Sequence, residues 1–245
     1  MPQAYRYAIY LAPVGPWREI GSAWLGRCEE TGERIARSRA DDPRLDAWTE
    51  APRRYGLHAT LKPPFRLRPG TTACGLDGAV RTLARAQRPF GTALELRALR
   101  GFLAWCLPDE AGAHANIRRV ADRMVRDLDA FRAAPTPDEI ARRHPEGLNP
   151  AQRRMLQEWG YPYLFDTFTF HITLTGMLSA TDLDHAGELL RARAGSALDG
   201  EMPVQAVSVY VQPRPGDPFV VARHYGFDGS TRDASGARFL DDDAP

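Results

Sequence analysis

The feature that most constrains the fold of this chain is a four-residue pattern that occurs once in each half. The first copy is His58-Ala59-Thr60-Leu61, and the second, 113 residues later, is His171-Ile172-Thr173-Leu174. In a β-strand, side chains two positions apart point to the same face. Each tetrad therefore predicts a strand that carries an imidazole and a hydroxyl on one face and apolar side chains on the other.

The elements expected around the two tetrads follow the same order, which is strand, helix and strand pair. After an opening strand at 5–13, the elements of the first half are expected at 57–61, 76–87 and 92–108. Those of the second half are expected at 168–178, 181–195, 202–213 and 217–227. This order predicts two similar lobes, although the identity outside the tetrads is too low to prove a duplication.

Local signals set the expected ends of these elements. Two consecutive prolines, Pro63 and Pro64, are expected to close the first tetrad's strand, because proline cannot donate to a strand ladder. In the second half, Thr181 is a candidate N-cap and Gly195 a candidate stop for the helix.

A segment without a counterpart lies between the two halves. Apolar residues recur at helical spacing over 114–133, and 134–163 contains a proline-punctuated pair of short helices. We therefore expect a helical insertion at about 114–160 within a single two-lobed domain at 1–227. The polar stretch 228–245, which is acidic at its end, is expected to be a flexible tail.

The two tetrads suggest a specific chemistry if their strands face one cleft. An imidazole works as base or acid near neutral pH, so His58 and His171 could act on opposite sides of one phosphorus. Hydroxyls of Thr60 and Thr173 could donate to the phosphoryl oxygens, where charge accumulates. If the first strand continues, Lys62 joins the same face and adds a cation. This scheme requires no metal and no cofactor.

Tyr10 is a further candidate for substrate binding. Strand parity in the opening segment places Arg6, Ala8 and Tyr10 toward the groove when Tyr7, Ile9 and Leu11 face the core. A partly buried sheet tyrosine explains the same pattern. Arginines of the insertion could approach a second phosphate of the substrate, although a solvated helix face is the simpler explanation; they are Arg118, Arg119, Arg142, Arg143, Arg153 and Arg154.

Composition excludes several classes of function. The formal net charge of +1 gives no support for binding duplex DNA, so phosphate recognition would be local. Three cysteines without a C-x-x-C pair fit a reducing compartment, and the chain has neither a signal peptide pattern nor a long apolar window. These features predict a cytoplasmic protein that does not span a membrane. There is also no G-x-S-x-G, glycine-rich phosphate loop or H-E-x-x-H motif.

The tetrads resemble those of the two-histidine (2H) phosphoesterase superfamily. More narrowly, five segments resemble the branch associated with bacterial phosphonate-utilisation gene clusters, and the resemblance covers most of residues 5–227; the segments read YRYAIYLAP, WLGR, HATLKPPFRL, FRAAPTPDEIARR and QEWGYPYLFDTFTFHITLTG. The resemblance implies an α+β fold of two pseudo-symmetric antiparallel sheets with the site in the groove between them. It also implies His58 and His171 as the acid/base pair and Thr60 and Thr173 as phosphate ligands.

The function expected from this resemblance is a metal-independent cyclic phosphodiesterase that hydrolyses a small ribose or nucleotide cyclic phosphate. Within phosphonate breakdown, a phosphoribosyl cyclic phosphate would be the natural candidate. Two alternatives remain open at this stage. One is an RNA end-processing or 2′,5′-ligating enzyme, which the near-neutral charge disfavours. The other is a phosphate-ligand or RNA-binding module without turnover. The sequence does not indicate the oligomeric state or which histidine is the base.

Overall fold

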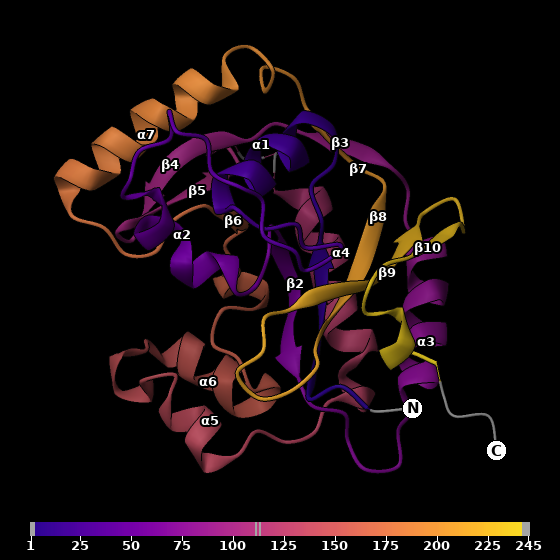
Figure 1. Ribbon diagram of the computed structural model, residues 1–245. Helices are drawn as coiled ribbons and strands as arrows, with labels where there is room; N and C mark the ends of the chain where they lie inside the picture. The colour runs from indigo at the N-terminus through magenta and orange to yellow at the C-terminus, as the bar shows by residue number, and fades with distance from the viewer. Residues whose placement is uncertain (1–2, 111, 113, 242–245) are drawn as a thin grey trace.

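The computed structural model describes residues 3–110, 112 and 114–241 (Figure 1). The fold is mixed α+β, with one eight-stranded antiparallel sheet and one two-stranded sheet. The large sheet has the strand order β10-β9-β8-β1-β2-β6-β5-β4, and β3 pairs with β7 in the small one. The predicted α+β class with antiparallel sheets is confirmed.

The strands are β1 (Arg6–Leu11), β2 (Ala59–Phe65), β3 (Phe90–Thr92), β4 (Glu95–Leu99), β5 (Phe102–Cys106), β6 (His171–Thr173), β7 (Met202–Val204), β8 (Ala206–Gln212), β9 (Val220–Gly226) and β10 (Thr231–Asp233). The helices are α1 (Gly15–Leu25), α2 (Leu45–Arg53), α3 (Ala73–Arg85), α4 (Ala115–Asp127), α5 (Pro137–Ala141), α6 (Pro150–Trp159) and α7 (Ala180–Ala194). The repeated order of strand, helix and strand pair is present after each tetrad.

The two tetrad strands, β2 and β6, are neighbours at the middle of the large sheet, where Ala59 pairs with Ile172. Strand β5, from the first half of the chain, pairs with β6, and β8, from the second half, pairs with β1. One end of the sheet (β10, β9, β8) comes from the second half of the chain and the other end (β5, β4) from the first, but β1 and β2 lie between β8 and β6, so the two halves are interleaved at the middle.

The main core lies on one face of the sheet. Helices α1, α3, α4 and α7 pack there, with Trp24, Leu76, Met124 and Leu190 among the buried side chains. A smaller apolar cluster lies on the opposite face, and Tyr10 belongs to it. Because the helices fill one face, the polar residues of the tetrads are directed toward the other face.

The insertion forms helices as predicted, and Figure 1 shows α5 and α6 in the lower part of the view, with α7 at the top. Both begin with a capping box followed by proline. Thr136 and Glu139 cap α5, and Asn149 and Gln152 cap α6. Such caps satisfy amide groups that a helix start leaves without partners, and they fix where each short helix begins.

The prediction that Pro63 and Pro64 end the first tetrad's strand is wrong. β2 runs through both prolines to Phe65. The pairing of β1 with β2 shifts register on either side of Ile9, so the prolines lie at an irregular part of the ladder that requires no amide donor from them.

The second tetrad's strand is shorter than expected, because its flanking backbone groups bond elsewhere. The Leu174 carbonyl accepts a hydrogen bond from Trp24 Nε1, and the Gly176 amide donates to the Trp48 carbonyl. The following helix is capped by Ser179 rather than by Thr181, and it ends at Gly195 as predicted.

The expectation of a flexible tail from residue 228 is corrected for the described part of that segment. Strand β10 pairs with β9, and Phe239 and Leu240 are buried in the main core. Apolar burial thus holds a segment whose composition is mostly polar. Residues 242–245 lie outside the described residues. Within the described ranges, no helix is long and apolar enough to cross a membrane.

Candidate active site

The alternation predicted for the two tetrads is present in the fold. Ala59 and Leu61 on β2, and Ile172 and Leu174 around β6, are buried in the main core. The intervening polar residues therefore face the other side of the sheet. There they line one cavity of about 400 Å³, whose lining includes His58, Thr60, His171 and Thr173.

The register relates the two tetrads by an approximate twofold symmetry. Ala59, the middle residue of the first H-x-T, pairs with Ile172, the middle residue of the second, and the strands are antiparallel. This register sets His58 opposite Thr173 and Thr60 opposite His171. Each imidazole therefore lies across the strand pair from the hydroxyl of the other tetrad.

The two imidazoles are held in the same way. Nδ1 of His58 lies 2.8 Å from the Gly56 carbonyl oxygen, and Nδ1 of His171 lies 2.9 Å from the Thr169 carbonyl oxygen. A carbonyl only accepts hydrogen bonds, so Nδ1 carries the hydrogen in both rings. The second nitrogen, Nε2, is then the one left for proton exchange in the cavity.

Gly56 allows this arrangement beside His58. Its φ of +75° lies in the left-handed region, which favours glycine. A Cβ at this position would also lie 2.8 Å from Cβ of Glu29. The residue two positions before the first histidine is therefore restricted to glycine if its carbonyl is to accept from the imidazole.

Aromatic rings lie near both histidines. The Tyr10 ring stacks on the His58 imidazole with centroids 3.9 Å apart and an interplanar angle of 23°. The ring centroid of Tyr55 lies 6.1 Å from that of His58, and the ring centroid of Phe102 lies 5.8 Å from that of His171. Tyr10 is among the residues that line the cavity, but only 1% of it is exposed, because its ring also packs against Tyr210 and Phe219.

Burial lowers the pKa of both histidines. Desolvation and the nearby His171 lower the pKa of His58 to about 4, against the opposing effect of the Gly56 hydrogen bond. Desolvation, with a contribution from Arg100, also lowers the pKa of His171 below its usual 6.5. At neutral pH both imidazoles are therefore neutral in the free protein, with Nε2 ready to accept a proton.

The threonine hydroxyls differ in how they are bonded. Thr175, which also lines the cavity, accepts from the Leu103 amide and donates to the Gly176 carbonyl. Within the described part of the chain, no hydrogen bond engages the hydroxyl of Thr60 or Thr173. These two hydroxyls are therefore available to donate to a ligand, whereas that of Thr175 supports the local backbone.

Lys62 does not join this group, which corrects the expectation from strand parity. Its ammonium donates to the Val125 carbonyl at 3.1 Å and lies 3.4 Å from an Asp129 oxygen, on the side of α4. The cause is a β-bulge. Thr60 pairs with Tyr10 but Lys62 pairs with Ile9, so one extra residue reverses the alternation and turns Lys62 into the core.

We expect Lys62→Met to keep kcat/KM within about threefold of the native value, because the lysine lies outside the cavity. Loss of a donor that stabilised charge in the transition state would instead lower kcat/KM by about a hundredfold.

The same variant tests how Lys62 affects stability. Burial lowers the pKa of Lys62 to about 8 from 10.5, so the unfolded chain binds more protons than the folded chain between these pH values. The free energy of unfolding of the native protein should therefore rise with pH across this window, relative to the variant. Kinetics and urea titrations at several pH values test both points.

Several lining residues were not singled out from the sequence. Three lie in connecting segments and one begins β5; they are Tyr55, Tyr161, Met177 and Phe102. Tyr55 precedes the first tetrad by three positions and Tyr161 lies in the segment before the second. Neither position follows a strand or helix period that would have indicated a role.

The remaining histidines lie outside the cavity. His224 bonds Ser208 and Glu30, His185 bonds Asp42, and His114 lies 2.8 Å from the Pro108 carbonyl oxygen. Among the described residues there is no group of three or more histidine, cysteine or acidic side chains that could hold a metal ion.

Comparison with known proteins places the chain in a family. Residues 60–220 match the family model described as a protein of unknown function, DUF1045. The chain belongs to this family. The matched segment runs from within the first tetrad to the start of β9, so it contains Thr60 and the whole second tetrad.

Two curated relatives carry the name ribose 1,5-bisphosphate phosphokinase PhnN. The protein of Janthinobacterium sp. (strain Marseille) is 35% identical over 240 residues, which cover 94% of this chain and 52% of the relative. That of Laribacter hongkongensis (strain HLHK9) is 35% identical over 226 residues, covering 89% and 51%. The chain spans about half the length of these relatives.

Among solved structures, Usb1 of Kluyveromyces marxianus with uridine monophosphate is similar at 9% identity and a TM-score of 0.38. The match covers 89% of this chain and 97% of that one.

Proposed function

We propose that this protein opens a small cyclic phosphate ester by two-histidine acid/base catalysis without a metal, as members of the two-histidine phosphoesterase superfamily do. The observation that carries the proposal is the symmetric pair of imidazoles. Both are oriented by an Nδ1 contact to a carbonyl two residues earlier, and both line the same cavity with a threonine hydroxyl opposite. A binding site for phosphate would not need two imidazoles fixed in the same tautomer.

In the proposed reaction, Nε2 of one histidine removes a proton from water as its oxygen attacks phosphorus. Nε2–H of the other histidine gives a proton to the ring oxygen as its bond to phosphorus breaks. The product is a phosphomonoester with a free hydroxyl, and the two imidazoles have exchanged protonation states. Because His58 has the more clearly lowered pKa, we assign it as the base and His171 as the acid for ring opening.

The hydroxyls of Thr60 and Thr173 are proposed to donate to the two non-bridging oxygens. Negative charge accumulates on these oxygens in the transition state, where donors fixed in advance are most effective. The two hydroxyls lie on adjacent strands, so the phosphate would sit between the tetrads. The stacked Tyr10 ring limits rotation of the His58 imidazole and so helps to keep its Nε2 on the reaction path.

A phosphorylated ribose is the substrate we favour. The two relatives are named for a ribose bisphosphate, which supports a sugar phosphate for the half that this chain shares with them. The kinase reaction in their name is not proposed here. The chain has no glycine-rich phosphate loop ending in lysine, and its single lysine, Lys62, is buried against α4.

A bell-shaped pH profile is expected for kcat/KM. Activity requires one neutral and one protonated imidazole, so it falls below about pH 4 as His58 gains a proton. It also falls above the pKa of His171, which lies below 6.5. The maximum of kcat/KM is thus expected below pH 6.5. The pH profile of kcat should lie at higher pH, because an anion bound beside the histidines stabilises the imidazolium. Initial rates across this range test it; a kcat/KM that rises steadily above pH 6.5 would contradict it.

Phosphorus NMR with a panel of esters tests the proposed activity. The panel holds 2′,3′-cyclic nucleotides, ribose cyclic phosphates, a linear phosphodiester and a short RNA. We expect ring opening of at least one cyclic ester and slower or no cleavage of the linear one. Processing of RNA alone, with binding that weakens steeply in salt, would favour the end-processing alternative. Binding without any turnover would favour a non-catalytic module.

A further inference from the structure

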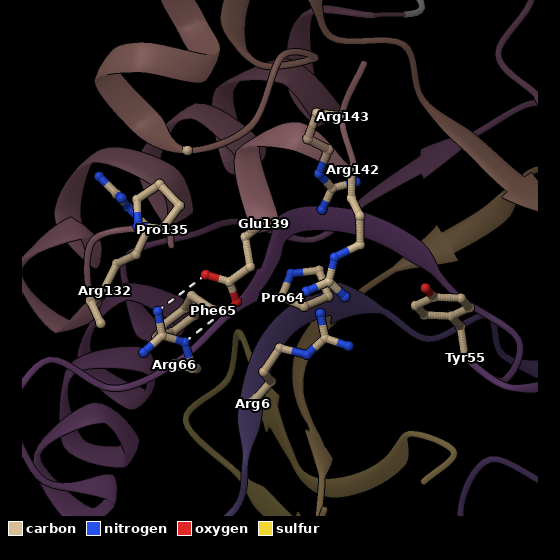
Figure 2. A pocket seen from close by; sticks show the side chains of 12 residues that line it. Arg6, Tyr55, Pro64, Phe65, Arg66, Arg132, Pro135, Glu139, Arg142 and Arg143 are labelled. Atoms are coloured by element: carbon tan, nitrogen blue, oxygen red, sulfur yellow. Dashed lines mark hydrogen bonds and ion pairs between the residues drawn. The ribbon is translucent and has the colours of Figure 1, made fainter. Parts of the chain in front are cut away.

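A second pocket, of about 210 Å³, adjoins the catalytic cavity (Figure 2). The two share four lining residues, Arg6, Tyr55, Pro64 and Arg143. Arginines dominate the second pocket, which is lined by Arg6, Arg66, Arg132, Arg142 and Arg143 but by a single acidic residue, Glu139. A ligand bound at the histidines would therefore have this positively charged pocket directly beside it.

The acidic groups nearby are already used by two of the arginines. Arg66 contacts both carboxylate oxygens of Glu139, as the dashed lines of Figure 2 show, and one of these oxygens also accepts from the Thr136 amide in the α5 cap. Arg132 forms a two-point pair with Asp129. Glu139 and Asp129 thus neutralise Arg66 and Arg132.

The other three guanidiniums lack a direct acidic contact in the part of the chain that the structure describes, although the charge of Arg6 helps to lower the pKa of Glu139. Within the described ranges, no ion pair joins Arg6, Arg142 or Arg143 to a carboxylate. In Figure 2 their side chains extend toward the same part of the pocket, on the far side of Glu139 from Arg132. Three like charges gathered in this way repel one another, and an anion between them would relieve that repulsion.

Neutral contacts hold these three side chains in place. Arg6 donates from Nε to Gln212 Oε1 at 2.8 Å, and Arg142 donates from Nε to the Asp138 carbonyl at 3.2 Å. The Arg143 guanidinium lies 4.7 Å from the centre of the Tyr161 ring. The terminal nitrogens of all three make no hydrogen bond within the described part of the chain. They therefore remain available as donors with partly fixed directions, which suits phosphate recognition.

We infer that the arginine pocket binds a second, terminal phosphate of the substrate, while the histidines and threonines hold the cyclic phosphate. The inference rests on the proposed function and narrows its substrate to a cyclic phosphate ester of a sugar that also carries a phosphomonoester. The three guanidiniums would give this pocket a local positive charge for a dianionic phosphate. The chain as a whole needs no large positive charge, and its formal net charge is only +1.

Two ribose cyclic phosphates that differ only in a phosphate on O5 test this inference. The native protein should prefer the phosphorylated compound in kcat/KM by about a hundredfold, since each hydrogen bond to a charged group contributes about tenfold or more. Arg142→Gln should reduce this preference by about tenfold, mainly through KM. The matched control is Arg154→Gln, an exposed arginine on α6 that lines neither pocket, and it should leave the preference unchanged within about twofold.

Calorimetry on the His58→Ala/His171→Ala variant separates the pocket from the chemistry. This variant should still bind the O5-phosphorylated compound more tightly than the other, and adding Arg142→Gln should remove most of the difference. If that result is found but the native protein opens neither ring, the second phosphate site stands and the proposed hydrolysis fails. Equal affinity for both compounds, unchanged by Arg142→Gln, would overturn the inference.

Discussion

His58→Ala and His171→Ala are each expected to lower kcat for ring opening by about 10³- to 10⁴-fold, and the double variant by little more than either single one. The reason is that the base and the acid act in the same step, so removal of one makes the other ineffective. The Nδ1 contact of each ring is to a backbone carbonyl on its own strand segment, so the substitutions should leave the fold intact. Single-turnover rates and ligand affinities measure the effect.

His185→Gln provides the control for these variants. His185 lies on α7, contacts Asp42 and is not among the residues that line the cavity, and glutamine can keep a donor there. Its kcat should stay within about twofold of the native value. A loss of only tenfold in both catalytic variants, with affinity for ligand falling in parallel, would show that the histidines bind rather than transfer protons.

Thr60→Val and Thr173→Val are each expected to lower kcat by about a hundredfold, with a smaller change in KM. Valine keeps the shape of the side chain and removes the hydroxyl that the proposal directs at a non-bridging oxygen, where donation matters most in the transition state. Thr60→Ser and Thr173→Ser should keep activity within about tenfold, because the hydroxyl remains. Steady-state kinetics on one cyclic ester compare all four. If valine and serine variants lose activity equally, the methyl group and not the hydroxyl is what the site requires.

That the histidines and threonines of the two tetrads share one face of the sheet could be predicted because strand parity is a local property. Knowing that Ala59 and Ile172 face the core is enough to place the flanking histidines and threonines on the other face. The pairing of the two strands through Ala59 and Ile172 could not be predicted from either tetrad, because it depends on how all the strands of the sheet are arranged.

Lys62 shows where local parity fails. A single extra residue in β2, opposite Ile9 and Tyr10, reverses the alternation, and nothing in the residues around it indicates a bulge at that point. The prolines that follow were expected to end the strand, yet they are tolerated because the ladder is irregular there.

The arginine pocket could be predicted only in part. The sequence indicated the insertion as a region that could contact a second phosphate, but it did not distinguish among six candidate arginines. Only Arg142 and Arg143 reach the pocket, and Arg6 joins them from β1, far away in sequence. Arg142 and Arg143 follow α5 directly, whereas Arg6 begins β1, so their convergence depends on the tertiary fold and not on any sequence period.

The most direct test of the two-histidine account is phosphorus NMR of the best cyclic ester of the panel in the presence of a chelator, with the native protein and the His58→Ala/His171→Ala variant side by side. The account predicts that the native protein opens the ring at an undiminished rate after chelation and that the variant, folded and still able to bind the ester, does not. Ring opening that continues in the variant, or that appears in the native protein only when a metal ion is added, would contradict it.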